Sequence, residues 1–183
     1  MDYKMKIAGL DRSLPLCKLT DDLKIAAFVI FGDAELTVAC AEKLLEAAPE
    51  YDYVITAEAK GIPLAHEMAR QHGDDYYFVA RKHPKLYMTS VFKVDVRSIT
   101  TDAEQNLYLD GADAERMKGK RILIVDDVVS TGESLKAVEK LVGEAGGIVC
   151  GKMAILAEGD ARTRDDLIYL EELPLFDRDG NPI

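Results

Sequence analysis

The segment Ile122–Ser134, with the sequence ILIVDDVVSTGES, constrains the fold of this chain more than any other part of it. Its four leading apolar residues predict a buried strand, and the polar, glycine-containing run that follows predicts a tight loop opening a helix. Two adjacent carboxylates, Asp126 and Asp127, stand at the end of that strand. In α/β folds, ligands bind beyond the carboxyl ends of parallel strands. The segment therefore predicts a ligand site as well as a fold class.

The same loop combines acceptors for a sugar with donors for an anion. Asp126 and Asp127 can accept hydrogen bonds from two neighbouring ribose hydroxyls. Backbone amides at the start of the predicted helix, together with its dipole, favour a phosphate. The residues placed around this anion site are Ser130, Thr131, Gly132, Glu133 and Ser134. The loop thus predicts a site for ribose 5-phosphate, and a solvated carboxylate pair before a helix cap is the plain structural alternative.

Strands and helices alternate along the rest of the chain. Helices are predicted from Asp33 to about Ala48, from Ile62 to Gln71 and from Gly132 to Glu144. Strands are predicted at Tyr53–Ala57, Tyr76–Ala80, Arg121–Val125 and Ile148–Leu156, with further short ones at 92–96 and 107–109. Residues 1–32 are predicted to be irregular and 110–119 a turn-rich connection. The alternation predicts one α/β domain whose central, mainly parallel sheet is flanked by helices.

Composition excludes several functional classes. A formal net charge of −10 argues against general nucleic-acid binding, which needs surplus Lys and Arg. The longest apolar run, Ile25–Phe31, is too short to span a bilayer. Three widely spaced cysteines form no C-x-x-C pair, which argues against a zinc site or a disulfide framework. We therefore expect a cytoplasmic protein of one domain that binds neither nucleic acid nor a membrane.

ILIVDDVVSTGES resembles the 5-phosphoribosyl 1-diphosphate (PRPP) signature of type I phosphoribosyltransferases, and the resemblance extends from about residue 20 to residue 170. It implies that family's fold, with a PRPP-binding core at 33–156 and a small hood formed by residues 1–32 and 157–183. By the same resemblance Asp126 and Asp127 are the catalytic pair and residues 130–134 hold the 5-phosphate. A receiver domain can begin with a similar strand, but too few residues follow Asp127 to complete one.

Two further segments resemble the diphosphate site of adenine and xanthine phosphoribosyltransferases. One is the sequence EAKG after a predicted strand, and the other is the basic segment RKHPK. The residues that the resemblance assigns to diphosphate are Glu58, Ala59, Lys60, Gly61, Arg81, Lys82 and Lys85. The alternatives are an ordinary turn for the first segment and a solvated basic turn for the second. His83 is interpreted as a packing or surface residue.

Residues 88–106 match the position of the family's catalytic loop. Ser98 and Thr100 resemble the xanthine-type loop. Adenine-type enzymes carry a glutamate near the position of Thr100, and this chain does not. Closure of such a loop would exclude water from the activated sugar.

The base pocket is assigned to Leu23–Ala34, which resembles the xanthine-type hood, and to a strand end at Glu158. The residues proposed for it are Leu23, Phe28, Ile30, Val128 and Glu158. Ile30 and Gly159 stand where the xanthine enzyme carries a polar Asn and a Lys. An apolar pocket with a carboxylate acceptor favours an amino-bearing base, although Phe28 and Ile30 are equally compatible with plain core.

The resemblance implies a Mg²⁺-dependent purine phosphoribosyltransferase (a pentosyltransferase) of purine salvage, with PRPP and a nucleobase as substrates and adenine as the favoured base. Mg²⁺ is expected to arrive with PRPP rather than in a protein cage, so no metal ligand is assigned. The alternatives are transfer to xanthine, guanine or orotate, or a non-catalytic sensor of PRPP. Relatives are commonly homodimers, so a homodimer is expected by analogy.

Overall fold

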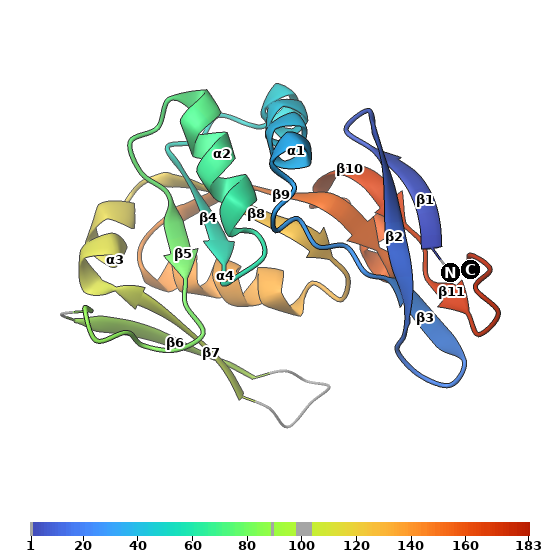
Figure 1. Cartoon of the computed structure of the whole chain (residues 1–183). Coiled ribbons are helices and arrows are strands. Elements are labelled where there is room, and N and C mark those ends of the chain that lie inside the picture. The colour runs from blue at the N-terminus through green and yellow to red at the C-terminus, as the bar shows by residue number, and fades with distance from the viewer. Residues whose placement is uncertain (1, 89, 98–103) are drawn as a thin grey trace.

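The computed structural model describes residues 2–88, 90–97 and 104–183. Figure 1 shows a large sheet with helices on both faces and a smaller sheet beside it. The large sheet has five parallel strands in the order β10–β9–β8–β4–β5. Their bounds are Ile168–Leu173, Ile148–Glu158, Arg121–Val129, Tyr53–Ala57 and Phe78–Ala80. The predicted α/β fold with a parallel central sheet is confirmed.

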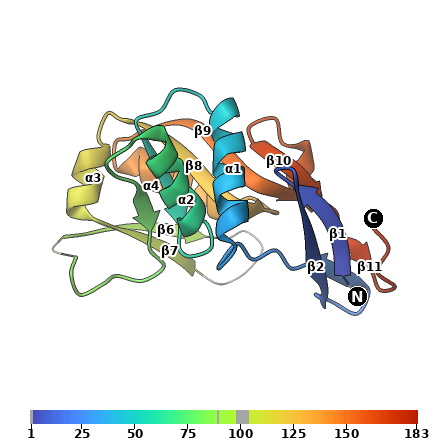
Figure 2. The same cartoon turned by 45° about the horizontal axis from the view of Figure 1, so that its top comes forward.

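Helices cover the two faces of this sheet unequally. Helices α1 (Ala34–Ala47) and α2 (Ile62–His72) pack together on one face. Helix α4 (Glu133–Glu144) lies on the other face, where the hairpin of β6 (Val91–Arg97) and β7 (Glu104–Asp110) packs against it. The turned view in Figure 2 shows α1 and α2 in front of the sheet, with the hairpin at its lower edge.

Strand β8 divides the hydrophobic core between these faces. Leu123 and Val125 belong to the cluster that includes α1 and α2, whereas Ile122 and Ile124 belong to the cluster that includes α4. All four side chains are almost fully buried. Because side chains alternate across a strand, a continuous apolar run is what a strand covered on both faces requires. This burial fixes β8 and the direction of the residues that follow it.

The prediction that residues 1–32 are irregular is wrong. They form β1 (Asp2–Ile7), β2 (Leu10–Lys18) and β3 (Leu23–Ala26) of an antiparallel sheet completed by β11 (Phe176–Asp177). Ala8 and Gly9, both with positive φ, make the two-residue turn between β1 and β2. Pro15 lies inside β2, and its presence obscured the alternating pattern of this strand. We call this four-stranded sheet the hood.

Two further boundaries differ from prediction. The turn-rich connection predicted at 110–119 contains helix α3 (Gly111–Met117), which Asp110 caps by accepting from the Ala112 amide at 3.4 Å. The seven residues are too few for a clear helical period. The C-terminal segment also serves both sheets, since β10 joins the core sheet and β11 joins the hood. Within the described residues, no helix is both long and apolar enough to cross a membrane.

Candidate active site

The two carboxylates after the apolar run lie at the carboxyl end of β8. The strand continues to Val129, past the predicted end at Val125, so both aspartates are held by strand geometry. The Asp127 side chain is buried, and the Asp127 amide donates to Asp126 Oδ1 at 2.9 Å. Burial and the neighbouring Asp127 carboxylate raise the pKa of Asp126 above its ordinary value. The raised pKa reflects the cost of placing two carboxylates side by side in a partly buried position.

The loop after β8 leads directly into helix α4. Gly132 is the N-cap residue and has φ 77°, a left-handed conformation that glycine adopts without a steric penalty. A glycine brings no capping side chain, and the Glu133 amide donates to Thr131 Oγ1 at 3.5 Å, so the other free amides of the first turn of α4 are available to an anion. Ser134 lines the same cavity as the two aspartates. The start of α4 therefore borders the cavity that the two aspartates line, and its role as the 5-phosphate site stays a prediction.

A second loop, residues 58–61, lies beside the first and joins β4 to α2. The Glu58–Ala59 peptide bond is cis. A side chain at Gly61 would collide with the Thr56 hydroxyl and would lie 3.1 Å from Asp126 Oδ1. Only glycine therefore allows this loop to approach β8 so closely. Lys60 Nζ reaches across to Asp127 Oδ2 at 3.0 Å, the single contact of that otherwise unpartnered oxygen within the described residues.

Glu58 gathers the basic segment that follows β5. It accepts from the Lys82 amide at 3.0 Å and lies 3.3 Å from Arg81 Nη2 and 3.9 Å from Lys85 Nζ. Burial alone would raise the pKa of Glu58, but the Lys82 amide and the two cations lower it further than burial raises it. The carboxylate thus holds Arg81 and Lys85 at the edge of the loop rather than pointing at a ligand itself.

A cavity of about 580 Å³ joins the two loops. It is lined by Ala57, Glu58, Ala59, Lys60, Lys82, His83, Asn106, Leu107, Asp126, Asp127, Val128, Ser134 and Ala137. Predicted residues from the ribose, 5-phosphate and diphosphate groups are thus brought to one place. Arg81 and Lys85 lie behind Glu58, outside this lining. Gly61 and residues 130–133 belong to the same two loops but do not line the cavity.

Two residues that line the cavity were not predicted from the sequence to be site residues. Asn106, in β7, has a buried Oδ1 without a hydrogen-bond partner among the described residues. His83 lines the cavity although it was interpreted as a packing or surface residue. No local pattern marked Asn106, because it follows Gln105 in the strand sequence EQNLYL and nothing distinguishes the two amides. Ser98 and Thr100, by contrast, lie outside the described residues.

The predicted base pocket is dispersed. Of its five residues, only Val128 lines the cavity. Leu23 pairs with Asp177 inside the hood, and Phe28 and Ile30 are buried in the core, the alternative noted for them. Their neighbours Val29 and Phe31 are 55% and 51% exposed.

Glu158 ends β9, half-buried, and burial raises the pKa of its carboxyl. The segment from β3 to α1, which carries Val29 and Phe31, crosses near the carboxyl ends of β8 and β9 in both views (Figures 1 and 2).

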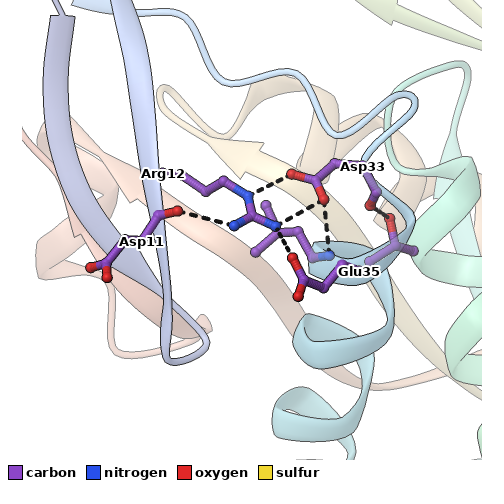
Figure 3. A network of polar contacts seen from close by, with 6 residues as sticks. Asp11, Arg12, Asp33 and Glu35 are labelled. Carbon is purple, nitrogen blue, oxygen red and sulfur yellow. Dashed lines mark hydrogen bonds and ion pairs between the residues drawn. The ribbon is translucent and has the colours of Figure 1, made fainter.

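The hood is tied to the core at the start of α1. Figure 3 shows Arg12 of β2 reaching Asp33 and Glu35, with Nε–Oδ2 and Nη2–Oδ1 distances of 2.7 and 3.0 Å to Asp33 and an Nη2–Oε2 distance of 2.9 Å to Glu35. Asp33 also caps α1 by accepting from the Leu36 amide at 3.0 Å. The Arg12 guanidinium lowers the pKa of Asp33. Asp33 thus caps the start of α1 and also binds Arg12 of the hood.

Comparison with known proteins identifies the family. A family model described as the phosphoribosyl transferase domain matches residues 34–176. The chain belongs to the phosphoribosyltransferase family. A hypoxanthine/guanine phosphoribosyltransferase of Methanocella paludicola is 31% identical over 148 residues, which cover 80% of this chain and 72% of that protein. One of Methanococcus voltae is 35% identical over 113 residues, 62% of this chain and 56% of that protein.

Solved phosphoribosyltransferase structures share the fold. The adenine phosphoribosyltransferase of Thermoanaerobacter pseudethanolicus superposes with a TM-score of 0.70 at 24% identity, covering 87% of this chain and 95% of that one. The enzyme of Giardia lamblia, solved with 9-deazaadenine, gives 0.63 at 17% identity, covering 94% and 93%. The type I phosphoribosyltransferase fold predicted from the sequence is therefore confirmed. The sequence relatives are named for hypoxanthine and guanine, whereas the structural neighbours are named for adenine.

Proposed function

We propose that this phosphoribosyltransferase transfers the 5-phosphoribosyl group of PRPP to a purine base in purine salvage. The observation that supports the proposal is one cavity in which the carboxylates of Asp126 and the buried Asp127 stand between the loop 58–61 and the start of α4. The spacing suits a ribose with a phosphate on one side and a diphosphate on the other. A site for a nucleotide alone would not require the second loop and its lysine.

The reaction follows from the charges around the cavity. Asp126 and Asp127 accept hydrogen bonds from the two ribose hydroxyls, and their negative field favours a sugar that becomes cation-like as its bond to diphosphate breaks. The base nitrogen bonds to the anomeric carbon, the electron pair of the broken bond leaves with diphosphate, and the base gives its proton to solvent. The product is a nucleoside 5′-monophosphate.

Lys60 links binding to this reaction. Its ammonium group neutralises Asp127 at 3.0 Å when no substrate is present. A bound ribose takes over that carboxylate, which frees Lys60 for the diphosphate beside it. Lys82, which also lines the cavity, supplies a second cation on the same side. The growing charge of the leaving group is thus met by groups already in place.

Mg²⁺ fits this site as a companion of PRPP. Among the described residues no group of three or more His, Cys, Asp or Glu is placed to hold a metal ion. The buried Asp127 oxygen and its neighbour Asp126 can accept from metal-bound water, which suits an ion that keeps several waters. When bound, the ion would neutralise diphosphate charge. Its removal by a chelator is expected to abolish turnover.

Among purines we propose adenine first. The half-buried Glu158 carboxylate is an acceptor for an exocyclic amino group, and Gly159 beside it offers no side-chain donor for an oxo group. The exposed Val29 and Phe31 are apolar surfaces against which a base can stack. Hypoxanthine and guanine form the second candidate, because the sequence relatives are named for them.

The test measures diphosphate release from PRPP and Mg²⁺ with adenine, hypoxanthine, guanine, xanthine and orotate supplied separately. We expect turnover with adenine. Turnover with hypoxanthine or guanine alone would replace adenine while preserving the reaction. Binding of PRPP without turnover for any base would refute the enzyme and leave the PRPP sensor.

We also propose a homodimer and a cytoplasmic location. Leu86 and Tyr87 are exposed apolar residues that follow the basic segment directly, a suitable surface for a second copy. Cys17, Cys40 and Cys150 are unpaired, which fits a reducing compartment.

A further inference from the structure

Arg164 lies in none of the segments that resemble the family's motifs, yet it lies against one of them. It follows the short 3₁₀ helix Gly159–Thr163, in the connection between β9 and β10. Its side chain is 22% exposed, so most of this arginine is enclosed. An enclosed guanidinium needs hydrogen-bond acceptors for its N–H groups. The positions of those acceptors show which N–H groups remain unbonded and where they point.

Asp166 holds one edge of the guanidinium. Nε lies 3.0 Å from Asp166 Oδ1 and Nη2 lies 2.8 Å from Oδ2, a bidentate pair with a fixed plane. Asp166 is itself held by Lys152 at 2.9 Å, and Lys152 also pairs with Glu139 of α4 at 2.9 Å. Lys152 and Arg164 lower the pKa of Asp166 to about 2, so the anchor stays ionised at physiological pH.

The free edge of the guanidinium faces the loop that begins α4. A β-carbon built on Gly132 would lie 2.6 Å from Arg164 Nη1 and 3.4 Å from Cζ. Within the described part of the chain, Nη1 has no hydrogen-bond partner, and it is not among the buried atoms that lack one. Its donors are therefore open to a ligand beside Gly132.

The loop needs such a donor. Residues 130–134 contain no positive side chain, and Glu133 adds a negative one. Lys136, one turn further into α4, pairs with Glu133 at 3.2 Å. Backbone amides would otherwise meet a doubly charged phosphate with no neighbouring cation from the loop. Arg164 is the enclosed cation that the fold brings to this loop from elsewhere.

We propose that Arg164, oriented by Asp166, binds the 5-phosphate of PRPP and of the nucleotide product through its Nη1 edge. The proposal rests on the proposed function and adds a residue that the motif does not contain. The carboxylate anchor leaves the guanidinium one free edge, so the arginine is preorganised for one acceptor and pays little further ordering cost on binding. Ligands without the 5-phosphate should be indifferent to it.

The test compares binding of ribose 5-phosphate and of magnesium diphosphate by titration calorimetry to the whole protein. In Arg164→Gln we expect about tenfold or greater loss of ribose 5-phosphate affinity, the range of a charged hydrogen bond. Diphosphate affinity should not change. Arg164→Lys should restore part of the ribose 5-phosphate affinity. Arg178→Gln, which removes one positive charge from an exposed residue of the C-terminal turn, should change neither affinity.

The outcomes separate this inference from the proposed function. Wild-type protein that binds ribose 5-phosphate, with unchanged affinity in Arg164→Gln, would overturn the role of Arg164 alone. Wild-type protein that binds neither ribose 5-phosphate nor PRPP would overturn both. Equal losses for ribose 5-phosphate and diphosphate would show a general structural role and also refute the assignment. If the glutamine variant does not fold, Arg164→Lys and Arg164→Met decide, since only lysine should retain affinity.

Discussion

The ionised Asp126 side chain lowers the stability of the folded protein, because it lies partly buried beside a second carboxylate. Lys60 offsets part of that charge through Asp127. Two adjacent carboxylates lower the stability of the fold. They favour binding, because ribose hydroxyls can donate hydrogen bonds to them and cations can neutralise their charge. Functional sites commonly retain perturbed carboxylates of this kind.

This cost should depend on pH. Folding raises the pKa of Asp126, so the folded state binds its proton more tightly than the unfolded state. Stability is therefore lost as pH rises from the unfolded pKa through the folded one. Asp126→Asn removes the ionisation. We expect the variant to gain about 1–3 kcal/mol over wild type at about pH 8, and less at about pH 5.

Urea unfolding at the two pH values measures this difference. Asp22→Asn, at an exposed carboxylate of the hood, is the control and should shift stability equally at both. An advantage of Asp126→Asn that is the same at both pH values would contradict the assigned burial cost.

At the scale of elements, the sequence predicted the core well and the hood poorly. The run Ile122–Val125 is apolar at every position, which indicates a strand covered on both faces. Helices α1, α2 and α4 matched their predictions to within a residue or two because caps and breakers such as Asp33, Gly73 and Gly132 mark their ends. The hood strands are short, and one contains Pro15.

The site residues were also predicted unevenly. Loops that carry several polar residues together, such as 126–134 and 58–61, were recognisable from sequence and meet in one cavity. Single residues brought in from elsewhere were not. Asn106 and Arg164 have no local pattern, and only the packing of β7 and of the β9–β10 connection brings them to the site. Phe28 and Ile30 were predicted to line the base pocket but are buried in the core, whereas their neighbours Val29 and Phe31 are exposed.

The tie between hood and core should be measurable as a coupling energy. Arg12→Gln breaks its pair with Asp33, and Asp33→Asn keeps an N-cap acceptor while removing the charge. A double-mutant cycle of these two changes should give a coupling of about 1–2 kcal/mol in urea unfolding, reduced by salt because both side chains are partly exposed. Simple additivity of the two effects would show that the pair does not hold the hood.

At the scale of the whole molecule, the basic segment lies between the active site and an exposed apolar surface. Leu86 is fully exposed and Tyr87 is 64% exposed, next to Lys85, whose Nζ lies 3.9 Å from Oε1 of Glu58 in the loop 58–61. A second copy seated there would cover apolar area and steady the basic segment. Sedimentation velocity is expected to show a dimer for wild type and a monomer for Leu86→Asp.

Leu19→Asp, which places the same charge at an exposed leucine of the hood, serves as the matched control and should leave the dimer intact. A wild-type monomer across the concentration range would refute this assembly. A dimer unaffected by Leu86→Asp would place the interface on another surface.

We propose that Asp126 and Asp127 hold the ribose of PRPP while its bond to diphosphate breaks. The most direct measurement is diphosphate release from PRPP, Mg²⁺ and the accepted purine by wild type and by Asp126→Asn/Asp127→Asn. Loss of two charge-assisted contacts should lower kcat/KM by at least about a hundredfold, with the fold retained by circular dichroism. Turnover by the double variant at the wild-type rate would show that the two carboxylates do not hold the ribose during the reaction.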